Sequence, residues 1–159
     1  ECSLVKKKKS TDQKNWIWLI SVFLLSIVGA ISFIKSPYFD LVQVNGLAPA
    51  FHFNLITQSS IFGGCLFAGL GILISVIEID RIKRLWDNHY LDNLYRSAVI
   101  GMTANLITVV AAESLVFLKF SEQVSRFLVN IEVVSSFIGI VFFAWSVKYL
   151  FYIVLRTKK

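Results

Sequence analysis

The chain has 159 residues, of which 56% are hydrophobic and only 16% are charged. An average soluble domain has roughly 25% charged residues, so this composition indicates either a membrane protein or an unusually apolar core, and the distribution of the apolar residues decides between them. The net charge of +6 would suggest a nucleic acid partner in a soluble protein. Here the positive residues flank apolar segments, where they indicate membrane topology and contact with the lipid bilayer, and nucleic acid binding is not expected.

Four long apolar segments follow one another along the chain and predict four transmembrane helices. A spanning helix needs about 20 mostly apolar residues, and a backbone in lipid must satisfy its own hydrogen bonds, which favours helices. We place the spans near 16–34, 58–79, 97–118 and 127–150. The predicted fold class is all-α, a polytopic four-transmembrane-helix bundle that forms one domain over residues 1–159.

The distribution of lysine and arginine predicts which side of the membrane each segment faces. Twelve of these residues lie in the two terminal tails and in the segment between the second and third spans, and three lie on the opposite side. By the positive-inside rule, both termini are then cytoplasmic. We expect a multi-pass protein of the cell membrane, in bacteria the inner membrane. The inner residues are Lys6, Lys7, Lys8, Lys9, Lys14, Arg81, Lys83, Arg84, Arg96, Arg156, Lys158 and Lys159, and the outer ones are Lys35, Lys119 and Arg126.

The first connection, residues 35–57, is expected to form an external loop. It contains Pro37 and Pro49, which interrupt helices, and the turn signal Asn45-Gly46. Because the segment is otherwise apolar, we expect it to lie on the outer membrane interface or over the helix ends.

Residues 80–96 predict a short cytoplasmic helical hairpin between the second and third spans. Asp80 and Arg84, and Lys83 and Asp87, are spaced to form helical i,i+4 ion pairs. A cytoplasmic protein partner could dock on this hairpin, and a solvated loop with lipid contacts is the alternative. The docking residues would be Arg81, Lys83, Arg84 and Trp86.

Three of the predicted spans carry a narrow stripe of small residues. At 100° per residue, each stripe falls on one side of its helix. Small residues let membrane helices approach closely, so we expect the stripes to pack inside the bundle, with a water-filled path as the alternative. The stripes are Ser60, Gly64, Ala68, Gly71, Ser75 and Glu78; Ser97, Gly101, Ala104, Thr108 and Ala111; and Glu132, Ser135, Ser136, Gly139 and Ser146.

Two acids, Glu113 and Glu132, are predicted to lie about 8 Å inside the outer membrane face, and Glu78 is a third intramembrane acid. Ionisable residues within membranes are functional candidates. Glu132 belongs to the small-residue stripe and should face protein. Glu113 lies about 140° from the stripe of its helix, so it should face a second subunit or a pore, which predicts a homo-oligomer. Alternatively, each acid pairs with Lys119, Arg126, Asn130 or the external loop and only shapes the fold.

The sequence offers no catalytic constellation, so we expect neither an enzyme nor a cofactor. His52 and His89 are predicted to lie on opposite sides of the membrane, which argues against a metal site. Cys2 and Cys65 are also expected to be far apart.

The layout resembles four-helix membrane components of bacterial anti-phage systems, such as the Rex-type exclusion membrane protein and the Kiwa membrane subunit. The shared features are a cytoplasmic N-terminus, an apolar external loop, a small-residue second helix, a basic segment at 80–84 and two tightly joined helices. The resemblance is architectural and carries over no site residue. It implies a membrane sensor or ion-channel-like component of antiviral defence that works with a cytoplasmic partner. A bacteriocin or toxin immunity protein and a structural subunit of a larger membrane complex are the alternatives.

Overall fold

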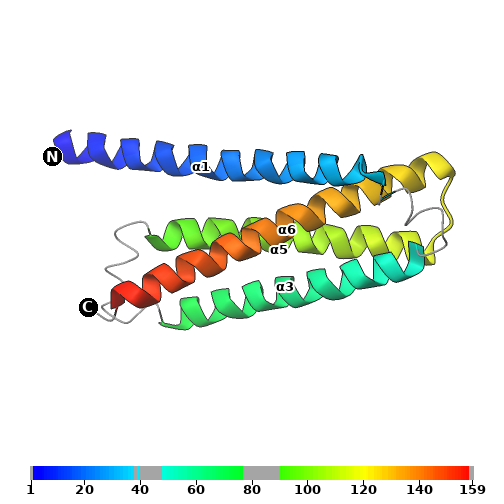
Figure 1. Cartoon of the computed structure of the whole chain (residues 1–159). Helices are drawn as coiled ribbons and strands as arrows, with labels where there is room; N and C mark the ends of the chain where they lie inside the picture. The colour runs from blue at the N-terminus through cyan, green and yellow to red at the C-terminus, as the bar shows by residue number, and fades with distance from the viewer. Residues whose placement is uncertain (1, 38, 40–47, 77–89, 158–159) are drawn as a thin grey trace.

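The computed structural model describes residues 2–37, 39, 48–76 and 90–157, and these form four helices without a strand (Figure 1). Helix α1 spans Cys2–Ile34, α3 spans Ala48–Val76, α5 spans Tyr90–Phe117 and α6 spans Glu122–Thr157. The predicted all-helical fold is confirmed.

Each of the four helices contains a segment long and apolar enough to cross a membrane: Trp16–Ile34, Pro49–Ile72, Asp92–Phe117 and Glu122–Tyr152. Large apolar side chains cover the outside of the bundle, and Leu25 and Phe67 are 71% and 70% exposed. Water-soluble monomers rarely expose apolar surface on this scale. The chain therefore has the character of a multi-pass membrane protein, and the side on which its termini lie stays a prediction.

Helix α3 begins within the segment that we expected to be an external loop. Residues 48–57 form its first turns, because Pro49 stands in the first turn, where its missing N–H removes no intrahelical hydrogen bond. Pro49 thus starts this helix instead of interrupting one. The consequence is that His52 becomes part of the bundle.

The predicted cytoplasmic hairpin falls mostly on residues 77–89, which lie outside the described residues. Glu78 and the four docking residues Arg81, Lys83, Arg84 and Trp86 belong to that segment, so their roles stay predictions. Helix α5 begins at Tyr90, which is before the expected start of the third span at residue 97.

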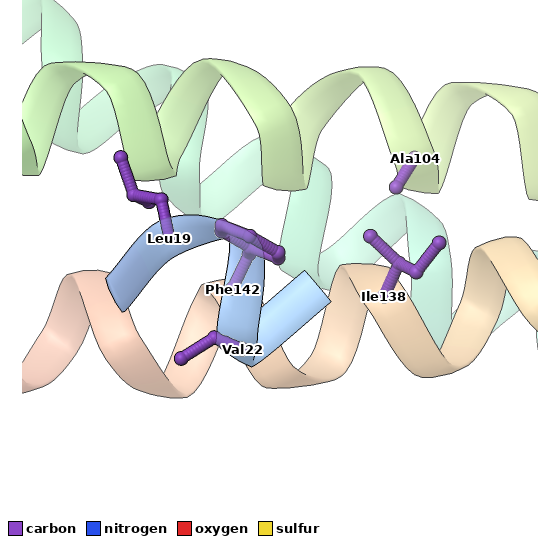
Figure 2. Close-up of a cluster of buried hydrophobic side chains, with 5 residues drawn as sticks. All are labelled: Leu19, Val22, Ala104, Ile138 and Phe142. Atoms are coloured by element: carbon purple, nitrogen blue, oxygen red, sulfur yellow. The ribbon is translucent and has the colours of Figure 1, made fainter. Parts of the chain in front are cut away.

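Helices α5 and α6 pack against each other most extensively, α3 packs mainly on α5, and α1 lies against α6 (Figure 1). One apolar cluster forms where α1, α5 and α6 meet, around the fully buried Phe142 (Figure 2). A second cluster, around Val133, lies nearer the turn that joins α5 to α6, and a third joins Leu66 and Leu70 of α3 to Ala98 of α5.

The small-residue stripes of α5 and α6 are buried between helices. At Gly101, an added Cβ atom would lie 2.9 Å from Leu66 Cδ1 and 3.3 Å from Phe142 Cβ. At Gly139, it would lie 2.7 Å from Asn105 Oδ1. At both glycines a side chain would crowd a side chain of a neighbouring helix, which would have to move to make room.

The stripe of α3 requires a correction, because Ser60, Gly64, Ala68 and Gly71 are exposed and do not pack inside the chain. The buried face of α3 instead contains His52, Ser59, Leu66 and Leu70. Leu66 and Leu70 fill the space beside Ala98 of α5, and His52 contacts α6. These contacts fix the rotation of α3 and turn its small residues outward.

Candidate functional site: a buried polar seam

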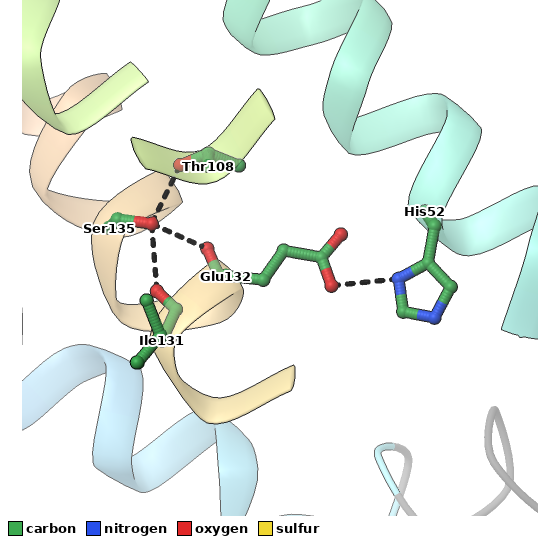
Figure 3. A network of polar contacts seen from close by, with 5 residues as sticks. All are labelled: His52, Thr108, Ile131, Glu132 and Ser135. Carbon is green, nitrogen blue, oxygen red and sulfur yellow. Dashed lines mark hydrogen bonds and ion pairs between the residues drawn. The ribbon is translucent and has the colours of Figure 1, made fainter. Parts of the chain in front are cut away.

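An imidazole and a carboxylate meet inside the bundle. His52 Nδ1 of α3 lies 2.7 Å from Glu132 Oε2 of α6, and the two side chains are 10% and 0% exposed (Figure 3). The second carboxylate oxygen, Glu132 Oε1, is buried and has no hydrogen-bond partner among the residues that the structure describes. A buried charge is costly unless it is paired and hydrogen-bonded, so the burial of Glu132 favours its contact with His52.

Helix periodicity explains how His52 reaches the interior. Residues seven apart lie on nearly the same face of a helix, and His52, Ser59 and Leu66 are all buried at that spacing. On α6, Glu132 shares the buried face with Ser135, three residues further on. The two helices therefore meet at the His52–Glu132 contact, while Ser135 faces Thr108 of α5.

A hydroxyl pair lies one turn further along α6. Thr108 Oγ1 of α5 and Ser135 Oγ of α6 are 2.8 Å apart (Figure 3). Ser135 Oγ also lies 2.7 Å from the carbonyl oxygen of Ile131 and 3.1 Å from that of Glu132. The acid is thus connected to α5 through the hydroxyl of Ser135 and its own backbone.

Asn105 of α5 occupies the middle of the bundle. Its Nδ2 donates a hydrogen bond to the carbonyl oxygen of Gly101 at 2.8 Å. Its amide end lies where Gly139 of α6 leaves room, and its Cβ faces Gly63 of α3. Asn105 Oδ1 and the buried Ser59 Oγ have no hydrogen-bond partner among the described residues.

The buried polar residues continue toward the other end of the bundle, where Ser97 Oγ of α5 and Ser146 Oγ of α6 are 3.0 Å apart. From Glu132 to Ser146 the rise along α6 is about 21 Å, compared with a membrane hydrocarbon core of about 30 Å. We call this set the polar seam. It consists of His52, Ser59, Ser97, Asn105, Thr108, Glu132, Ser135 and Ser146.

The chemistry of the polar seam suits protons. An imidazole in hydrogen-bond contact with a carboxylate can share and exchange a proton with it. Hydroxyl groups both donate and accept hydrogen bonds. Between Asn105 and the Ser97–Ser146 pair the seam is interrupted by the buried Phe142, which packs at Gly101. Within the described part of the chain, no three His, Cys, Asp or Glu residues lie close enough together to hold a metal ion.

The structure separates the two acids singled out from the sequence. Glu132 is fully buried, whereas Glu113 is exposed on α5. Among the partners considered for Glu132, the structure shows His52, which belongs to the segment expected to be the external loop. Arg126 instead pairs with Glu122 at 2.7 Å on the exposed surface.

Sequence reasoning missed the role of His52, which it considered only as a metal ligand. Two signals could have revealed that role. Pro49 marks a helix start as readily as a helix break, and the seven-residue spacing from His52 to Ser59 and Leu66 continues the buried face of α3.

Comparison with protein-family models, with curated proteins and with solved structures finds no match to this chain.

Proposed function

We propose that this chain is a membrane-embedded, proton-responsive sensor or channel-like component, with the His52–Glu132 pair at its centre. The observation that carries the proposal is the fully buried Glu132 carboxylate in contact with an imidazole, among helices apolar enough to span a membrane. Ionisable residues inside membranes are rare, and they often belong to proton relays and ion pathways. Histidine is the side chain that most readily changes charge near neutral pH.

The proposed response is a change in the contact between α3 and α6. In this structure, the pair joins the first turns of α3 to α6 through one 2.7 Å contact. A change in the number of protons on the pair changes its charge, and an uncompensated buried charge is unfavourable. Protonation would therefore shift the packing of α3 on α6. The nearest other residues of the polar seam, Thr108, Ser135 and Asn105, provide further groups that could bind protons or water inside the bundle.

The architectural resemblance to anti-phage membrane components supplies a biological setting for the proposal. In that setting, the chain would detect or cause a change across the membrane and act with a cytoplasmic partner protein. An immunity protein or a structural subunit would need no proton exchange at Glu132, which makes the functions distinguishable by experiment.

Proton flux into liposomes tests the channel-like function. The full-length chain is reconstituted with a pH-sensitive dye inside the vesicles, and an inward proton gradient is applied. We expect acidification with the wild type, loss of at least most of it with Glu132→Gln or His52→Gln, and wild-type acidification with Glu113→Gln. Equal proton flux through the wild type and Glu132→Gln would show that the polar seam is not the proton path. Absence of flux through the wild type would show that the chain does not conduct protons.

A further inference from the structure

One face of α3 is exposed and is not covered by the residues that the structure describes. Its small residues fall within about 80° of helix rotation, and all are exposed. An added Cβ at Gly64 or Gly71 would meet no atom within 4 Å. We call this the α3 stripe. It consists of Thr57, Ser60, Gly64, Ala68, Gly71 and Ser75.

Beside the α3 stripe lies a hollow of about 450 Å³ between α3 and α5. Its lining includes Ser60 and Gly64 of the stripe, Leu106 of α5, and Ser59. Ser59 is only 2% exposed, and its Oγ has no hydrogen-bond partner among the described residues. The hollow therefore combines a surface that permits close approach with a buried hydroxyl that can still bond.

Glu113 lies on the same side of the molecule. It follows Leu106 by seven residues and so shares its face of α5. Glu113 is exposed, and the described residues provide it with neither an ion pair nor a hydrogen bond. A carboxylate that faces lipid in this position is unfavourable, so a covering surface should bring it a hydrogen-bond donor.

We propose that a second copy of this chain covers this surface, in a parallel two-fold dimer in which the α3 stripes contact each other. Two copies inserted in one membrane share their orientation, so α3 meets α3 in parallel. Small residues repeated every four positions, as at Ser60, Gly64 and Ala68, are the usual contact surface of such helix pairs. A two-fold axis beside the stripe makes this surface complementary to itself.

The same two-fold symmetry brings a hydrogen-bond donor, Asn54 of the second copy, toward Glu113. Within one copy, α5 lies on the Gly63 side of α3, because Gly63 contacts Asn105. Around the helix axis, Gly63 is about 100° to one side of Gly64, and Asn54 is about 80° to the other side. A parallel two-fold axis therefore turns the Asn54 side of one copy toward α5 of the other. Asn54 is exposed, so its carboxamide is available to donate.

The depths of these two residues also agree. Measured from the contact between Gly63 and Asn105, Glu113 lies about 12 Å along α5 and Asn54 about 13.5 Å along α3, in the same direction because the helices are antiparallel. The second copy thus places a carboxamide beside the exposed carboxylate. Thr57 of the second copy brings a hydroxyl to about the same membrane depth as Ser59, which lines the hollow.

Native mass spectrometry of the chain in lipid nanodiscs tests whether the α3 stripe is the contact surface of a dimer. We expect dimers with the wild type, monomers with Gly64→Leu, and dimers with Gly69→Leu. Gly69 is a matched control because an added Cβ there also meets no atom within 4 Å, but it lies about 140° from Gly64. A wild-type monomer, or a Gly64→Leu dimer as stable as the wild type, would overturn the proposal. So would recovery of one chain with a different protein on this face.

Cysteine cross-linking tests the two-fold geometry independently. In a background with Cys2→Ser and Cys65→Ser, the chain carrying both Asn54→Cys and Glu113→Cys should form a covalent dimer on mild oxidation in membranes. Each single cysteine variant should form several-fold less of it. A covalent dimer with either single variant at the same yield would contradict the predicted pairing and show a different arrangement of copies.

Discussion

Glu132→Ala is expected to lower the free energy of unfolding by about 3–5 kcal/mol, because it leaves the His52 imidazole in the interior without its partner. The carboxylate is fully buried, and its Oε2 lies 2.7 Å from His52 Nδ1. Removal of the side chain also leaves a cavity between α6 and the first turns of α3, where the carboxyl group contacts His52. Thermal and denaturant unfolding of the detergent-solubilised chain, followed by circular dichroism, measures the loss.

Glu113→Ala is the matched control for this prediction. It removes the same side chain at a similar predicted depth, but from an exposed position on α5. We expect the unfolding of the monomer to change by less than about 1 kcal/mol, since exposed substitutions have small effects. If both variants lose the same stability, burial of Glu132 is not the cause of the loss.

The double variant with His52→Leu and Glu132→Leu is expected to recover most of the stability that either single variant loses. Replacing a buried ion pair with apolar residues of similar volume is often neutral or stabilising, whereas removing one partner is strongly destabilising. A double-mutant cycle gives the coupling energy between the two residues, which we expect to reach about 1–3 kcal/mol. Additive losses in the cycle would mean that the two side chains do not interact.

The double variant also separates the structural role of the pair from its proposed functional role. Its fold should be retained, because leucine side chains fill the space between α3 and α6. It carries no group that could exchange a proton at these positions. A folded double variant with wild-type proton flux in liposomes would therefore assign the pair to structure alone.

The sequence was sufficient for the four helices because each contains an apolar segment of spanning length. It was also sufficient for the burial of Glu132, because the acid belongs to a stripe of small residues that permits helix contact. The sequence was not sufficient to predict the hydroxyl pairs Thr108–Ser135 and Ser97–Ser146. They depend on the register between α5 and α6, which a stripe on each helix does not determine.

The rotation of α3 could not be predicted from its small residues. In lipid, apolar side chains are equally well solvated outside the bundle, so hydrophobicity does not distinguish an inner face from an outer one. The small face and the face with Leu66 and Leu70 were both plausible contact surfaces. Packing against Ala98 and the contact between His52 and Glu132 select the second, and both depend on neighbours that are remote in sequence.

Proton exchange at Glu132 can be measured most directly by infrared difference spectroscopy of the full-length chain in lipid while the pH is stepped. The wild type and Glu113→Gln should both show the carbonyl band of a buried carboxylic acid changing with pH, and Glu132→Gln should lose that change. His52→Gln should alter the frequency of that band, because it removes the imidazole that contacts the Glu132 carboxyl group. A pH-dependent band of equal size in Glu132→Gln, or none in the wild type, would contradict a proton-responsive pair at the centre of this protein.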